Sequence, residues 1–174
     1  MVRVIDNREA FHEDIRRFWD ALTLSMGDNP FSIAAIQGVS LTFHDEDSQL
    51  SPDENCYSQF RPDVLAIDIF TTNLNRFWEE MFPGCAPELK YRYACWRELW
   101  HFWNHSRFAP LKFTLGEDWL YFLENFSRLS FLQSEYLAQY FAAMATSVID
   151  RDYDKALAFN KVSTFRDDAI STIL

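Results

Sequence analysis

Apolar side chains recur at helical spacing over much of the chain. After Asp6 they return every three or four positions, which predicts a helix over residues 7–26. Asp6 and Glu9 have the spacing of a capping box at the start of this helix. Gly27 is suited to end it, and a short helix over residues 30–37 is predicted to come next.

The periodicity changes after Gly38. Apolar and polar residues then alternate, which predicts a strand over residues 39–43. A strand needs hydrogen-bonding partners, and similar short alternations occur at residues 2–5 and 111–115. We therefore expect a small two- or three-stranded β element beside the helices.

Residues 62–82 begin with an apolar run, VLAIDIF, that is compatible with a strand or a helix. Most of the apolar residues in this segment fall within about 160° of a helical wheel, while strict alternation fails after Val64. The pattern therefore predicts one helix, with Pro62 in its first turn and Pro83 after its end.

The segment LKYRYACWRELWHFWNH, residues 89–105, predicts an aromatic-rich helix. Its apolar side chains fill an arc of about 200°, too wide to face a single neighbour, so we expect the central helix of a bundle. Cys95 lies within this arc, where burial makes a thiol unreactive. The remaining arc gathers basic groups and imidazoles.

Further helices are predicted over 114–132, 134–149, 152–161 and 164–173. Residues 1–174 therefore read as one domain, a mainly α helical bundle of about five to seven helices. Aromatic residues make up 17% of the 174-residue chain, which is ample for a core without disulfides or metals.

Several features predict a cytoplasmic protein. The three cysteines show no C-x-x-C spacing, which is ordinary for a reducing compartment. The N-terminal residues contain no apolar signal-peptide core, and the run from Tyr136 to Ile149 is too short to span a bilayer. We expect no membrane insertion.

The formal charge of −10 is unevenly distributed. Residues 18–60 contain seven carboxylates and no Lys or Arg. Such a surface repels phosphates, so direct nucleic-acid binding is disfavoured, whereas a protein with a basic surface, including one that itself binds nucleic acid, is a suitable partner. The expected contact residues are Asp45, Glu46, Asp47, Asp53 and Glu54, with Tyr57 and Phe60 as apolar anchors.

The polar face of the 89–105 helix offers an alternative site. The basic residues and imidazoles that could bind an anion are Lys90, Arg97, His101, His105 and Arg107. Glu98, His101 and His105 are spaced to bind a metal ion from one helix. The simplest interpretation is a solvated face, or one that pairs with the acidic segment.

Nucleophilic and phosphate-binding motifs such as G-x-S-x-G and G-x-x-x-x-G-K-[ST] are absent. The leading hypothesis is therefore a non-enzymatic acidic protein-binding domain without a cofactor, such as an inhibitor, immunity protein, adaptor or nucleic-acid mimic. The alternative is a metal- or anion-binding helical-bundle enzyme with its site on the Lys90–Arg107 face. If part of the aromatic arc is a subunit interface, the protein is a homo-oligomer.

Overall fold

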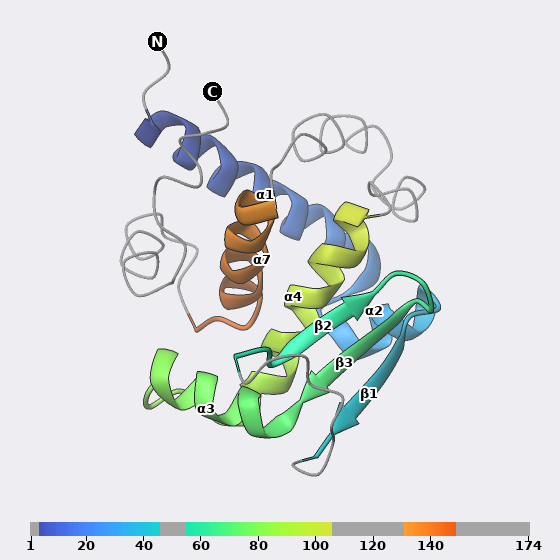
Figure 1. Ribbon diagram of the computed structural model, residues 1–174. Coiled ribbons are helices and arrows are strands. Elements are labelled where there is room, and N and C mark those ends of the chain that lie inside the picture. Colours follow the sequence, from blue (N-terminus) through green and yellow to red (C-terminus); the bar gives the residue numbers. More distant parts are fainter. Residues whose placement is uncertain (1–3, 46–54, 106–130, 149–174) are drawn as a thin grey trace.

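The computed structural model describes residues 4–45, 55–105 and 131–148 (Figure 1), with the side chains of residues 4–12 and 131–133 outside the description. This part of the chain forms five helices and a three-stranded sheet, which confirms a mainly α fold with a small β element. The elements are α1 (Val4–Met26), α2 (Pro30–Ile36), β1 (Ser40–His44), β2 (Ser58–Arg61), β3 (Ala66–Phe70), α3 (Thr71–Met81), α4 (Leu89–His105) and α7 (Phe131–Ala145).

The first two helices lie close to their predicted positions. Helix α1 already begins at Val4, so the capping-box interpretation of Asp6 is wrong. The chain leaves α1 at Gly27, whose positive φ of 79° suits a residue without a side chain. Asn29 then caps α2 by accepting the backbone N–H groups of Phe31 and Ser32 at 3.0 and 3.4 Å.

The sheet contains the predicted strand after Gly38 but different partners. Its order is β1-β3-β2, with β1 parallel and β2 antiparallel to β3. The predicted partner at residues 2–5 is wrong from Val4 onwards, because these residues begin α1. The other predicted partner, residues 111–115, lies outside the described residues. The helices predicted over 152–161 and 164–173 also lie outside them, as do residues 114–130 of the helix predicted over 114–132, whose last two residues belong to α7.

The prediction of a single helix over residues 62–82 is wrong. Residues 62–65 form a turn, 66–70 form β3, and α3 begins only at Thr71. All five residues of β3 are buried, so the strand carries apolar side chains on both faces and shows no alternation. This burial on both faces explains why residues 62–70 lack the strict alternation of apolar and polar residues that marks a half-buried strand.

Helix α4 is the centre of the fold, as predicted. It packs against α7 on one side and against the sheet and α2 on the other (Figure 1). Helix α7 begins at Phe131, three residues earlier than expected, and its residues 134–144 are all buried. Cys95 is buried, as predicted, and this burial raises the pKa of its thiol to about 12.

The core between α1, α4 and α7 consists mainly of aromatic rings. Phe141 of α7 lies at its centre, with ring centroids of neighbours 5.6 to 6.1 Å away. Edge-to-face and tilted arrangements of this kind add to the stability gained from burial. No helix in the described ranges combines the length and apolar character needed to cross a bilayer.

Candidate functional site

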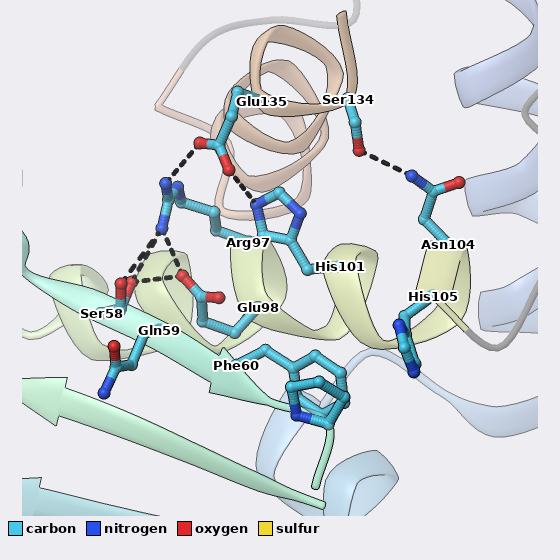
Figure 2. A pocket seen from close by; sticks show the side chains of 11 residues that line it. Ser58, Gln59, Phe60, Arg97, Glu98, His101, Asn104, His105, Ser134 and Glu135 are labelled. Carbon is cyan, nitrogen blue, oxygen red and sulfur yellow. Dashed lines mark hydrogen bonds and ion pairs between the residues drawn. The ribbon is translucent and has the colours of Figure 1, made fainter. Parts of the chain in front are cut away.

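The middle of the polar face of α4 is largely buried, whereas His105 at its end is exposed. The side chains of Arg97, Glu98 and His101 are only 13%, 2% and 17% exposed. Helix α7 covers this face from one side and strand β2 from the other (Figure 2). The interpretation of Arg97, His101 and Glu98 as a solvent-facing strip is therefore wrong.

Arg97 is the hub of a buried ionic network. One terminal nitrogen, Nη1, contacts Glu98 and donates to Ser58 Oγ at 3.2 Å, while Nη2 donates to Glu135 Oε2 at 2.5 Å. The guanidinium also lies 5.0 Å from the centre of the Tyr57 ring. Burial alone would lower the pKa of Arg97, but the surrounding acidic groups outweigh it and raise this pKa well above its usual value.

Glu135 of α7 joins Arg97 to His101. Its Oε1 atom lies 2.8 Å from His101 Nε2. Burial would raise the pKa of Glu135, but His101 and Arg97 together lower it to about 2. A lowered carboxyl pKa stabilises the fold at pH values above 4.5, the ordinary pKa of Glu. This stabilisation is lost as the pH falls from 4.5 toward 2.

Glu98 is held by only one of its two oxygens. Oε1 contacts Arg97 and accepts the Ser58 hydroxyl at 2.6 Å. Among the described residues Oε2 accepts no hydrogen bond, and Figure 2 shows the carboxyl group beside Ser58 and below Arg97, with dashed lines to only one of its oxygens. Glu98 lines the pocket, and its Oε2 is not one of the fully buried polar atoms that lack a partner, so water or a ligand in the pocket can donate to it.

A pocket of about 410 Å³ opens beside this network, between β2, α4 and α7 (Figure 2). The network residues line its polar wall. Phe60 and His105 form an aromatic wall, with ring centroids 6.0 Å apart. Where α4 approaches α7, Asn104 Nδ2 donates to Ser134 Oγ at 2.7 Å. The pocket therefore has an acidic interior and a ring-lined side.

The pocket has little of what nucleophilic catalysis requires. Of its two serine hydroxyls, that of Ser58 donates to Glu98, a carboxylate that is already paired with Arg97, and that of Ser134 accepts from Asn104. His101 faces Glu135 instead of the Ser58 hydroxyl. The described residues of the pocket thus bring carboxylates together with donors but supply no serine–histidine pair.

The structure places only part of the predicted acidic surface. Asp45 is exposed directly after β1, whereas Glu46, Asp47, Asp53 and Glu54 lie outside the described residues. Tyr57, expected as an exposed anchor, is buried and stacks on Phe77 with ring centroids 4.1 Å apart. Phe60 is half-buried against Phe102 and forms part of the pocket.

The structure brings three residues of the predicted anion site together. Arg97, His101 and His105 line the pocket, whereas Lys90 lies over the Tyr91 ring and Arg107 is outside the described residues. The terminal nitrogens of Arg97 already contact carboxylates, and an added anion would lie beside these carboxylates. The geometry therefore disfavours an anion.

The predicted metal site remains without structural support. Within residues 4–45, 55–105 and 131–148 no three His, Cys, Asp or Glu side chains are grouped so that they could hold a metal ion. His101 faces Glu135, while His105 lies against Phe60, so the E-x-x-H spacing at Glu98 does not gather its side chains at one point.

Glu135 and Ser58 are site residues that the sequence pattern did not single out. Glu135 is the only charged residue between Phe131 and Ile149, and a lone carboxylate in an apolar helix requires a buried partner. The sequence therefore contained a signal for Glu135. It contained no signal for Ser58, because the role of Ser58 depends on strand β2, which the periodicity did not indicate.

The chain was compared with protein-family models, with curated proteins and with solved structures, and none of the three comparisons found a match. No relative's activity can therefore be carried over to this pocket. Its function has to be argued from the contacts, burial and charge of its own residues.

Proposed function

We propose that the protein is a binding protein that takes a small polar ligand into the pocket between β2, α4 and α7. The observation that carries this proposal is Glu98, a nearly fully buried carboxylate that lines the pocket with one oxygen unbonded among the described residues. A ligand that donates a hydrogen bond to this oxygen would satisfy it.

The size and lining of the pocket support the proposal. Pockets for small molecules commonly measure about 300–1,000 Å³ and combine apolar walls with a few fixed polar groups. Here the volume is about 410 Å³, and the rings of Phe60 and His105 lie opposite polar groups held by the Arg97 network. The network fixes these polar groups before a ligand arrives, which reduces the entropy lost on binding.

We expect Asn104→Trp to abolish ligand binding, because an indole between α4 and α7 would occupy the pocket. The measurement is a thermal-shift screen of small polar metabolites. A ligand at a hundredfold excess over its Kd adds about 2.7 kcal/mol of stability, which corresponds to a rise in Tm of roughly 5–10 °C.

The matched control is Glu79→Trp, which adds the same side chain at an exposed position on α3. Each ligand found with the unmodified protein should stabilise this control and fail to stabilise Asn104→Trp. Ligands that stabilise both variants equally, or a screen without any ligand, would contradict the proposed pocket function.

A second candidate function is the acidic protein-binding surface, and one observation favours it. The two described flanks of the acidic segment are held at the same end of the sheet. His44 pairs with Phe70, and the backbone N–H of Phe70 also donates to Tyr57 O at 2.8 Å. Asp45, the described member of the acidic segment, is exposed at this end. A cytoplasmic partner protein with a basic surface would suit it.

Neutralising the acidic segment should weaken capture of such a partner and reduce its dependence on salt, while the Tm changes little. The variant replaces Asp45, Glu46, Asp47, Asp53 and Glu54 by their amides. The control variant neutralises five exposed carboxylates elsewhere, namely Glu13, Asp20, Asp28, Glu79 and Glu80. The measurement is quantitative pull-down of a co-purifying protein at two ionic strengths. Equal capture by both variants would argue against this surface.

A further inference from the structure

The network beside the pocket has an excess of negative charge. Glu98 and Glu135 contribute two carboxylates, and Arg97 contributes one guanidinium. These three groups together carry one more negative than positive charge in a largely water-excluded place, where charges interact more strongly than in water.

The contacts of Arg97 show which kind of chemical group fits beside Glu98 and Glu135. The guanidinium of Arg97 lies between the two carboxylates and over the Tyr57 ring. Planar N–H groups of this kind match carboxylate oxygens in pairs. Arg97 contacts only Oε1 of Glu98, which lines the pocket, so Oε2 can accept a second N–H donor from a ligand there.

The rest of the pocket suits the stem of such a ligand. Phe60 and His105 offer ring faces at the side of the pocket, and Pro62 extends this apolar wall. A cation can also lie favourably over the face of an aromatic ring. An alkyl or flat organic group could pack here while its charged end reaches Glu98.

We propose that the ligand is an organic cation with N–H donors, a guanidinium or a primary ammonium, whose charged end binds Glu98 and whose stem packs against Phe60 and His105. This inference rests on the proposed pocket function and names its ligand class. The same charged group occurs on small amines and on Arg or Lys side chains of proteins. In a protein, the stem that carries the charged group is attached to a peptide backbone. In a small amine it is not.

The test is isothermal titration calorimetry with agmatine, which carries a guanidinium and a primary amine. The unmodified protein should bind agmatine. Glu98→Gln should weaken binding at least tenfold, whereas Glu79→Gln, which removes an exposed carboxylate from α3, should leave it unchanged.

The tripeptide acetyl-Gly-Arg-Gly-amide separates the two sources. Tighter binding of agmatine identifies a small amine, and equal or tighter binding of the peptide identifies an arginine of a partner protein; either result supports the ligand class. Thermal unfolding of Glu98→Gln shows whether that variant folds, and Asn104→Trp provides a second pocket variant.

The ligand class is overturned if neither cation binds, or if Glu98→Gln binds both as well as the unmodified protein. Acetate and glycerol are titrated as an anionic and a neutral probe. Binding of one of these that Asn104→Trp abolishes would overturn the cation proposal while leaving the pocket function intact. If the metabolite screen also yields no ligand that Asn104→Trp blocks, the pocket function itself fails.

Discussion

Replacing Arg97 by methionine is expected to lower the free energy of unfolding by about 3–5 kcal/mol. The change leaves Glu98 and Glu135 buried and close together without the guanidinium that contacts both of them. An unpaired buried carboxylate is far more unfavourable than the loss of a surface ion pair. The measurement is equilibrium unfolding in urea at pH 7.

Two further variants show whether the lost stability comes from buried carboxylates that are left without a positive partner. Combining Arg97→Met with Glu98→Gln and Glu135→Gln removes the unpaired charges and should recover at least about 2 kcal/mol. Arg61→Met breaks an ion pair whose arginine is half-exposed and should cost about 1 kcal/mol at most. If the triple variant is no more stable than Arg97→Met alone, unpaired buried carboxylates do not explain the lost stability.

Phe141→Ala is expected to lower the free energy of unfolding by about 3–5 kcal/mol through the cavity it leaves. Phe141 is fully buried. Its ring contacts rings from α1 and α4, those of Phe18, Trp19, Trp96, Trp100 and Trp103. These large, stiff rings can close around a cavity only partially, so the loss should lie toward the upper end of this range.

The matched control is Phe43→Ala on β1. Phe43 is 46% exposed, and its ring lies against that of Tyr91 with 5.6 Å between the centroids. Its loss should cost less than about 1 kcal/mol. Urea unfolding of both variants under the same conditions gives the comparison. Similar losses for Phe141→Ala and Phe43→Ala would contradict the central position of Phe141.

The sequence predicted the elements whose apolar residues recur with one clear period. Alternation marked β1, helical spacing marked α1 and the aromatic helix α4, and the break after Gly27 preceded the short helix α2. It failed at β3, whose residues are buried on both faces and therefore show neither period clearly. Pairing of β3 with β1 and β2 decides its conformation, and this pairing joins segments that are distant in the chain.

The candidate site was predicted in part for a related reason. The wheel of the 89–105 helix correctly grouped Arg97, Glu98 and His101 on one face. It could not show that α7 and β2 would cover this face, because burial of a polar face depends on what a distant segment supplies. Glu135 supplies that partner, so a charged face that looks solvated in a helical wheel becomes the wall of a pocket.

The decisive experiment for the pocket and its ligand class is a crystal structure of the protein grown with agmatine. We expect the guanidinium or the amine of agmatine to lie in the pocket within hydrogen-bond distance of Glu98 Oε2, with the stem against Phe60 and His105. Agmatine bound elsewhere, or a pocket in which another group of the chain already satisfies Glu98 Oε2, would contradict both the site and the ligand class.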